Sequence, residues 1–447
     1  MNIRTVRGLG GLITGLILLV VFSVLLTRAM DTTSYNTWGA LIWAPLIIGV
    51  NLWLISIAMR NEPDRWVVRL VYIGYAAKLV GIAARYFTIF VLYDGVGDAS
   101  RYNLYAARWY FEWRRGVFEV SGDGKFGTHN TELITTAVYT VVGPSPIVGF
   151  LVFGTLAFWG CVLLFKAFQA AVPEGNFRRY AILVLLLPSL LFWPSSIGKE
   201  AFLLFGVGLT GLGAAKFFNR RIVAGLGYLT AGLVATSLIR PHLTVLLLSS
   251  LFVALLLRRG SGTPTSFLGK TVGLALVAAA SVLAITQAAD VLGIEDLTAE
   301  EVTGEIDWAS GQTDTGGSAF VPVPLSSPLG LPAAIITLLF RPFPWEASSG
   351  LVALQSLEGI ALLLLAIVGW RRLAQVPRLL RRNAWVVFAA VYVLAFILAF
   401  AGFANFGIVA RQRSLMIPFF LALLALPDPR RPHNALTDSE ERQLANA

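Results

Sequence analysis

The sequence predicts an all-α fold, a polytopic helical bundle that spans a membrane. The 447 residues are 56% hydrophobic and only 13% charged, and their mean hydropathy is +0.73. A soluble globular domain carries about a quarter charged residues, so this chain must contain long stretches without charge. Apolar runs close to the length of about 20 residues that crosses a bilayer recur along the whole chain. They predict one transmembrane domain over 1–429, followed by a short cytoplasmic tail over 430–447.

The apolar runs predict about twelve transmembrane helices. The first run follows Arg4 and Arg7, ends at Arg28 and lacks a small-residue cleavage signal, so we expect an uncleaved span. A further run over 331–340 is too short to span and predicts an interfacial or re-entrant helix. The twelve spans are expected near 9–27, 38–58, 67–92, 146–169, 180–195, 200–217, 222–239, 242–257, 268–288, 348–369, 384–403 and 413–427.

Arginine clusters between the runs predict the orientation, because cytoplasmic loops carry an excess of Lys and Arg. All of the clusters fall on one side if the N-terminus is cytoplasmic. Two long loops, 93–145 and 289–347, then face outward from the cell membrane, and both termini are cytoplasmic. The net charge of +10 sits beside apolar runs, which favours membrane lipids and excludes nucleic acid as a partner. The clusters contain Arg60, Arg65, Arg178, Arg179, Arg220, Arg221, Arg258, Arg259, Arg371, Arg372, Arg378, Arg381, Arg382, Arg430 and Arg431.

The first candidate site follows the third run, at the predicted outer surface. Two glycines permit a sharp turn there, and Asp98 then occupies an N-cap position. One interpretation is a capped interfacial helix within an aromatic belt. The other is a carboxylate that deprotonates or orients an acceptor hydroxyl, which two aspartates beside a tyrosine favour. The segment contains Asp94, Gly95, Gly97, Asp98, Arg101 and Tyr102.

A second candidate lies where Pro188, Pro194 and Gly198 interrupt an apolar run. Irregular backbone at membrane depth is tolerated where it lines a cavity. Lys199 and Glu200 then open the next predicted helix. The helix dipole disfavours a lysine at this end, so a bound anion such as a phosphate explains Lys199 more easily. A snorkelling lysine paired with a carboxylate is the alternative.

Two further outer connections carry charged side chains beside prolines. Arg240 and His242 flank Pro241, and together they suit a diphosphate and proton movement, although a single histidine at a helix start can be structural. Arg341 and Glu346 lie in a segment rich in proline and aromatic residues. That segment fits either an aromatic belt or the lip of a substrate site.

The connection between the last two spans carries Arg411 and Arg413 on the predicted outer side, against the charge bias. Arginine is suited to bidentate contact with phosphate, so ligand binding is the favoured interpretation. Lys78, Arg85 and Glu358 lie inside spans, and we expect them to face the bundle interior or to pair there.

These side chains together suggest glycosyl transfer from a phosphate leaving group. The reaction needs a base for the acceptor hydroxyl and cations for the departing phosphate, and the sequence suggests no Ser–His nucleophile. Three histidines and the single Cys161 exclude a disulfide and a typical zinc cluster. No metal site and no certain cofactor are predicted. A divalent cation held by Glu305 and Asp307 of the second loop is left open.

The segment Asp98-Ala99-Ser100-Arg101-Tyr102, with Ala106 after it, resembles the acidic first-loop motif of integral membrane glycosyltransferases of the GT-C type. It is also similar to the Asp-x-x-x-Tyr segment of EpsG- or Wzy-like polysaccharide polymerases, whose layout of about twelve spans this chain resembles. The resemblance implies a polyprenyl-phosphate- or diphosphate-linked sugar as donor and a glycan as acceptor. It further implies that Asp98 activates the acceptor, while the outer arginines hold the lipid phosphates.

Two alternatives to such a transferase or polymerase stay open. A transporter or flippase for a lipid-linked sugar would carry charges and broken helices near the bilayer midplane, in corresponding positions of two halves. The polar residues here concentrate on one face instead, and no internal repeat is visible. An O-antigen-type ligase shares the leaving group and differs only in the acceptor.

Overall fold

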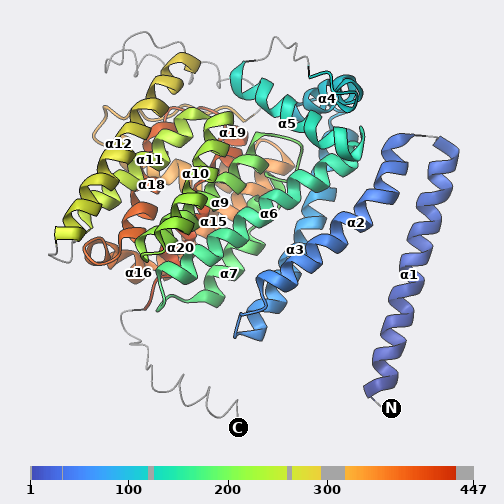
Figure 1. Ribbon diagram of the computed structural model, residues 1–447, viewed down its shortest axis with the longest axis horizontal. Coiled ribbons are helices and arrows are strands. Elements are labelled where there is room, and N and C mark those ends of the chain that lie inside the picture. Colours follow the sequence, from blue (N-terminus) through green and yellow to red (C-terminus); the bar gives the residue numbers. More distant parts are fainter. Residues whose placement is uncertain (1–2, 33, 119–124, 259–263, 293–317, 429–447) are drawn as a thin grey trace.

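The computed structural model describes residues 3–32, 34–118, 125–258, 264–292 and 318–428, and within these ranges the chain is helical (Figure 1). The described residues form no strand beyond an isolated bridge between Ala319 and Asn405. Within the described ranges, seven helices are long and apolar enough to cross a membrane, or up to nine if each of two bent pairs forms one span. The chain is therefore a helical membrane protein.

Three helices form the N-terminal part. Helix α1 lies beside α2 and stands apart from the rest of the bundle (Figure 1). Helix α3 ends in a π-helical turn, η1, which leads into the first candidate site. The bounds are Ile3–Thr32 for α1, Tyr35–Ala58 for α2, Arg65–Phe87 for α3 and Thr88–Leu92 for η1.

The centre of the bundle depends on glycines that let helices approach closely, as is common between membrane helices. A Cβ at Gly160 would lie 2.5 Å from the carbonyl oxygen of Leu204, and one at Gly232 would lie 2.6 Å from that of Gly206. Side chains at these positions would push α6, α9 and α10 apart. The bounds are Pro146–Ala171 for α6, Lys199–Phe218 for α9, Ile222–Ile239 for α10, Pro241–Leu257 for α11 and Pro264–Leu292 for α12.

The span expected over 180–195 is wrong, because the helix breaks there. Helix α7 (Phe177–Leu186) ends before Pro188, and a short helix α8 (Pro188–Phe192) leads into an irregular turn before α9. Buried Lys78 holds this turn, since its Nζ donates to the carbonyls of Leu190 (2.9 Å) and Pro194 (3.1 Å). The lysine therefore satisfies backbone groups that the missing helix would have paired.

The two long loops expected from the sequence contain helices. The first holds α4 (Asp98–Arg114) and α5 (Phe126–Val142), which pack together beyond the end of α3. The second holds α14 (Gly330–Phe340), which confirms the short helix expected there, and the turn η2 (Pro344–Glu346). Glu305 and Asp307, considered for a divalent cation, lie outside the described residues.

The C-terminal third contains both bent pairs. Residues 370–379 and α18 meet at 115°, and α19 and α20 meet at 62°. The span expected over 413–427 contains only the short, deeply buried α20, and α19 precedes it at an angle. The bounds are Gly350–Val368 for α15, Trp370–Ala374 for α16, Val376–Leu379 for α17, Ala384–Phe400 for α18, Phe406–Arg413 for α19 and Ile417–Leu424 for α20.

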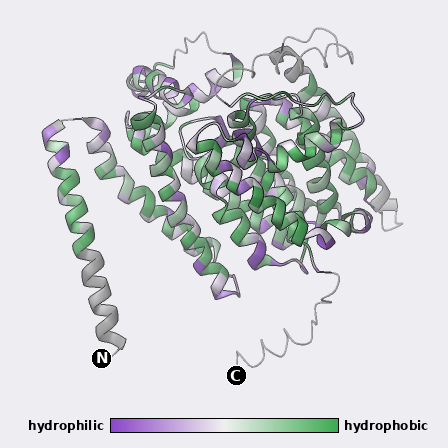
Figure 2. Cartoon of the chain, turned by 180° about the vertical axis from the view of Figure 1, so that it is seen from behind, coloured by the Kyte–Doolittle hydropathy of each residue, from purple (hydrophilic) through white to green (hydrophobic). Residues whose placement is uncertain are grey.

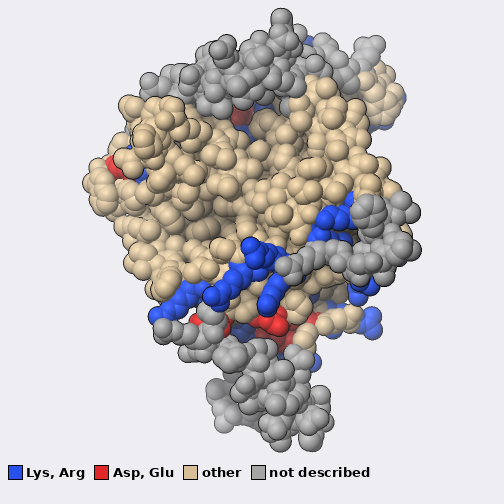
Figure 3. All heavy atoms as spheres, turned by 90° about the vertical axis from the view of Figure 1, so that its left-hand side faces the viewer, with Lys and Arg blue, Asp and Glu red and all other residues tan. Residues whose placement is uncertain are grey.

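The bundle has two polar ends, which we name the α4 end and the α16 end after the helices that lie there (Figure 1). Hydrophobic residues cover the helices between them (Figure 2). Contacts such as Arg178 Nε to Asp64 Oδ2 (2.6 Å) and Asn383 Nδ2 to the carbonyl of Ala171 (2.7 Å) join distant connections at the α16 end. Lys and Arg side chains form a band toward this end, below a wide uncharged surface (Figure 3).

Candidate functional site

The charged residues of the α4 end meet at Glu200, the second residue of α9. Glu200 is 4% exposed, and its Oε1 accepts from Arg240 Nη2 (3.0 Å) and from Arg411 Nε (2.8 Å). One carboxylate therefore joins α9, the turn between α10 and α11, and α19. Charge-assisted hydrogen bonds of this kind are stronger than neutral ones, and removing one partner leaves an uncompensated buried charge.

Arg411 extends the cluster to Asp98. Its Nη1 and Nη2 both lie 3.0 Å from Asp98 Oδ2, while the side chain of Asp98 is 55% exposed. Among the described residues, nothing hydrogen-bonds Asp98 Oδ1. The sharp turn expected before this residue is confirmed by Gly95 and Gly97, with φ of +77° and +142°.

The N-cap role suggested for Asp98 is wrong. Helix α4 begins at Asp98 itself, with Gly97 in the cap position and without a capping hydrogen bond from a side chain. The physical reason is the position of Arg411. Its guanidinium donates to the Asp98 carboxylate, which therefore does not accept a hydrogen bond from the backbone N–H groups at the start of α4. The aspartate is thus oriented by a cation from a distant part of the chain.

Lys199 and Arg240 complete what we call the Glu200 cluster: Asp98, Lys199, Glu200, Arg240 and Arg411. Lys199 Nζ donates to Thr128 Oγ1 on α5 (2.8 Å), and Arg240 also contacts Oε1 of Gln412. His242 lies within electrostatic range of Lys199 and Arg240, and its ring is 6.2 Å from that of Phe400. Thr128 carries no charge and lies outside the candidate segments, so sequence reasoning missed it. Gln412 lies in the candidate segment between Arg411 and Arg413, but only the two arginines were predicted to act there.

Tyr102 lies beneath the cluster, with 1% of its surface exposed. Burial raises the pKa of its hydroxyl well above the usual value, and the charges of Asp98 and Glu200 raise it further, against a smaller opposite effect of Arg411 and Arg240. The phenol is therefore protonated at neutral pH and can act as a hydrogen-bond donor.

Arg85 of α3 is a site residue that the sequence identified only as an intramembrane charge. Its guanidinium carbon lies 5.0 Å from the Phe192 ring and 4.9 Å from the Trp193 ring. Arg411, Glu200 and Asp98 are within its electrostatic range. Its buried Nε has no hydrogen-bond partner among the described residues. With Arg85, four cations face two carboxylates, and this excess of positive charge favours an anion.

Arg101 and Asp94 lie outside the cluster. Arg101, next to it on α4, donates from Nε to Glu132 Oε1 on α5 (2.9 Å). Asp94 is exposed in the turn before α4, with φ of +47°.

Arg341, Glu346 and Arg413 also lie apart from the cluster. Arg341 Nε pairs with Glu346 Oε1 (2.9 Å). Burial raises the pKa of Glu346, but hydrogen bonds from Arg341 and from the Phe343 N–H outweigh it and hold that pKa below its usual value. Arg413, expected to bind ligand, is fully buried, and its Nη1 donates to the carbonyls of Leu339 (3.2 Å) and Arg341 (3.1 Å). These contacts tie α19 to the end of α14.

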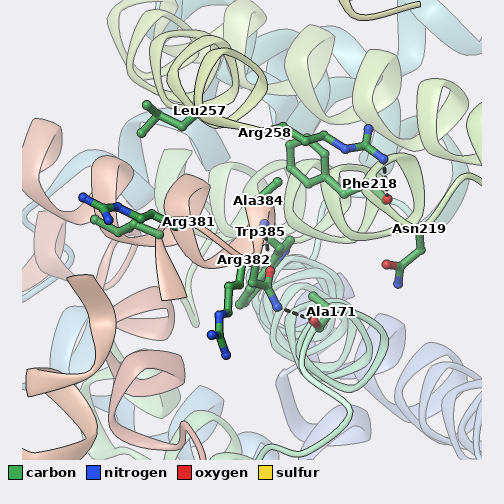
Figure 4. A pocket seen from close by; sticks show the side chains of 11 residues that line it. Ala171, Phe218, Asn219, Leu257, Arg258, Arg381, Arg382, Ala384 and Trp385 are labelled. Carbon is green, nitrogen blue, oxygen red and sulfur yellow. Dashed lines mark hydrogen bonds between the residues drawn. The ribbon is translucent and has the colours of Figure 1, made fainter. Parts of the chain in front are cut away.

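Neither of the two best-formed cavities contains the cluster. The larger, about 270 Å³, lies at the α16 end between Phe218, Arg258 and Trp385. Figure 4 shows that the guanidinium groups of Arg258, Arg381 and Arg382 around it point away from one another. A cavity of about 70 Å³ lies between α8 and α15. No group of three or more His, Cys, Asp or Glu side chains could hold a metal ion within the described ranges.

The convergent charges thus mark the α4 end as the candidate site, with the exposed carboxylate of Asp98 at its surface and Glu200 at its base. Comparison with known proteins adds no relative: no protein-family model, no curated protein and no solved structure matches this chain. The geometry of the charged cluster is therefore the evidence on which a functional proposal rests.

Proposed function

We propose that this protein is a membrane glycosyltransferase or polysaccharide polymerase. It would take a sugar from a polyprenyl-phosphate- or diphosphate-linked donor at the extracytoplasmic face, for a cell-envelope or exported polysaccharide. The observation that carries the proposal is a half-exposed carboxylate, Asp98, that Arg411 links to a buried pair, Glu200 and Arg240. A carboxylate that can accept a proton at the surface thereby lies next to the buried arginines of the site.

Asp98 has the position of the base. A hydroxyl of the acceptor glycan would donate its proton to Oδ1, the oxygen that Arg411 leaves without a contact. The hydroxyl oxygen then bonds to the anomeric carbon as the bond from that carbon to the phosphate oxygen breaks, and the electron pair leaves with the phosphate. A positioned general base contributes about 10²–10⁴-fold to such a step.

The cations have the position to receive the leaving group. Lys199, Arg240 and Arg411 outnumber the two carboxylates of the cluster, and Arg85 adds a fourth positive charge near enough to interact electrostatically with Arg411 and Glu200. Fixed cations placed where negative charge develops lower the barrier without reorganising during the reaction. The bonds to the buried Glu200 carboxylate hold Arg240 and Arg411 in place before substrate arrives.

An outward-facing α4 end is part of the proposal. It is supported by the basic connections of the α16 end, which short cytoplasmic loops favour. A flippase would need a mobile polar path across the bilayer. The intramembrane Lys78 instead bonds two backbone carbonyls and is 2% exposed, which favours a fixed structural role.

Complementation tests the proposal. Cells that lack this chain receive the wild type or Asp98→Asn, and both lipid-linked sugars and surface polysaccharide are measured. We expect Asp98→Asn to reach the membrane in normal amount, to abolish the polymer and to accumulate the lipid-linked intermediate. Asp94→Asn, which alters an exposed aspartate just before α4, serves as the matched control and should restore the polymer.

The leaflet of the accumulated intermediate separates the two classes. A blocked transferase leaves the lipid-linked sugar on the outer leaflet, where membrane-impermeant periodate oxidises it in intact cells. A blocked flippase leaves it on the inner leaflet, where it is protected until the cells are lysed. Protection, or normal polymer with Asp98→Asn, would overturn the proposal.

A further inference from the structure

One face of α4 carries side chains that lead away from the Glu200 cluster. Arg101, Tyr105 and Trp109 are spaced by four residues, so they share a helical face over about 12 Å. The Tyr105 and Trp109 rings are 6.4 Å apart and half-buried, and Arg108 lies over the Trp109 ring at 5.5 Å. The chemistry of the cluster uses none of these rings.

Helix α5 adds polar groups along the same face. The His129 ring stands perpendicular to Tyr105 with centroids 6.0 Å apart. Glu132 is 2% exposed, accepts from Arg101 Nε and lies 3.6 Å from His129 Nδ1. That nitrogen is buried and has no hydrogen-bond partner among the described residues. Aromatic faces and charged hydrogen-bonding groups therefore alternate along one stripe, which we define as Arg101, Tyr105, Trp109, His129 and Glu132.

The stripe is continuous with the candidate site at two points. Asp98 is three residues before Arg101 on the same helix, and Thr128, the neighbour of His129, accepts from Lys199 Nζ (2.8 Å). A molecule lying along the stripe would therefore present its end to Asp98.

We propose that the stripe binds the acceptor, an oligosaccharide of several pyranose rings whose end to be extended lies at Asp98. This inference rests on the proposed function and names the acceptor side of the same site. Pyranose rings expose C–H groups on their faces, which pack on aromatic rings, and hydroxyls at their edges, which bond to charged groups. The rings lie beside Arg101, whose side chain is 54% exposed and is held by buried Glu132, and this combination matches that chemistry.

An aromatic belt at the membrane interface would use the same residue types. Leucine can replace the aromatic rings of a membrane belt, but it cannot replace rings on which a sugar stacks. Leucine preserves the apolar surface that anchors a helix in the interface, but it removes the flat ring on which a sugar stacks. Tyr105→Leu and Trp109→Leu are therefore the test variants, and Phe111→Leu is the control because Phe111 is 47% exposed on another face of α4.

Binding is measured on the full-length chain in nanodiscs, with Asp98→Asn as the background so that no transfer occurs. The probe is the surface polysaccharide of the complemented cells, partially hydrolysed and separated by size. Oligosaccharides should bind more tightly than the monosaccharide. We expect each ring variant to weaken oligosaccharide binding by about tenfold, the loss of one stacking contact, and Phe111→Leu to leave it unchanged.

Equal binding by the ring variants and the control, or no size dependence, would overturn the inference. Thermal unfolding and membrane yield of Trp109→Leu show whether the variant is folded, and Trp109→Phe, which keeps a ring, should restore most of the affinity. The two proposals fail separately. Transfer that depends on Asp98 but not on the stripe overturns only this inference, whereas polymer synthesis without Asp98 overturns the proposed function.

Discussion

The Glu200 cluster and the α16 end are both rich in arginine, but the arginine side chains differ in their bonding partners and in their exposure to solvent. In the cluster, Arg240 and Arg411 bond a carboxylate that is 4% exposed. At the α16 end, Arg258 donates to the carbonyl of Phe218 (3.1 Å), and Arg381 and Arg382 are exposed. The exposed Arg381 and Arg382 remain hydrated, and they fit the excess of Lys and Arg that cytoplasmic loops carry in the proposed orientation. Charges in the cluster are fixed and partly dehydrated, an arrangement that suits ligand chemistry.

This difference also shows why cavity size is a poor guide here. The larger cavity is at the α16 end, where the surrounding guanidinium groups diverge (Figure 4). The cluster lines neither of the two cavities described above, yet its side chains converge on shared oxygen atoms. Convergence of charge under burial distinguishes the two ends better than volume does.

The largest expected effect of any substitution is on stability, for Glu200→Gln. It leaves Arg240 buried without a counter-charge and Arg411 with only the half-exposed Asp98, and breaking a buried pair costs about 3–5 kcal/mol. Asp428→Asn is the matched change at the α16 end, where Asp428 is 3.5 Å from Arg372 and partly exposed, and it should cost less than about 1 kcal/mol. Thermal unfolding in detergent compares the two variants. Similar losses would contradict the distinction between the ends.

A second prediction concerns function. Arg411→Gln removes the group that orients Asp98 and that would face the leaving phosphate in the proposed reaction, so we expect polymer synthesis to fall by about 10²-fold or more. Arg382→Gln, an exposed arginine at the other end, should leave synthesis unchanged. Polymer is measured per unit of protein in the membrane, so that a loss of expression does not count as a loss of activity. A strong effect of Arg382→Gln on polymer synthesis would contradict the interpretation that the arginines of the α16 end serve only to orient the protein in the membrane.

The sequence predicted the membrane bundle and located the main charges, because hydropathy and helix breakers are local signals. Asp98, Lys199, Glu200, Arg240 and Arg411 were all singled out before their contacts were known. Their pairing could not be predicted, since Asp98 and Arg411 are 313 positions apart. Nothing local distinguishes Arg411, which joins the cluster, from Arg413, which bonds backbone carbonyls two positions later.

The breaks in the helices were harder to predict than their existence. The apolar run 180–195 has the composition of a span, although Pro188, Pro194 and Gly198 predicted irregular backbone near its end. The bonds from Lys78 on α3 to the carbonyls of this turn could not be predicted, because they join distant parts of the chain. Glu132 and Thr128 were missed for a different reason. They lie in a segment expected to be a loop, whereas α5 places them against Arg101 and Lys199.

A smaller effect is expected for Arg85→Gln. The substitution removes one of four cations but keeps Glu200 and its two partners, so the fold should persist. If Arg85 contributes to binding the donor phosphate, the KM for the lipid-linked donor should rise by about tenfold, the range of a partly buried charged contact. The KM for the acceptor should stay the same. Arg85→Lys, which keeps the charge, should recover part of the donor affinity. An equal change in both KM values would indicate a structural role in packing Phe192 and Trp193.

The smallest effect is expected at the α16 end, where Asp64 pairs with Arg178. The hydrogen bond from Arg178 lowers the pKa of Asp64, and the Trp66 N–H adds to this against the opposing effect of burial. A carboxylate with a lowered pKa stabilises the fold above its unfolded pKa, and the contribution is lost as the pH falls through the folded value. Because Arg178 is 62% exposed, screening should keep the contribution below about 1 kcal/mol.

Asp64→Asn keeps an N-cap for α3, so comparing the unfolding of the variant and the wild type at pH 7 and at pH 3 isolates the contribution of the charge. The variant should be slightly less stable than the wild type at pH 7, the difference should be smaller at pH 3, and high salt should remove it at pH 7. A difference that persists in salt would show that charges at the α16 end are held as firmly as those around Glu200.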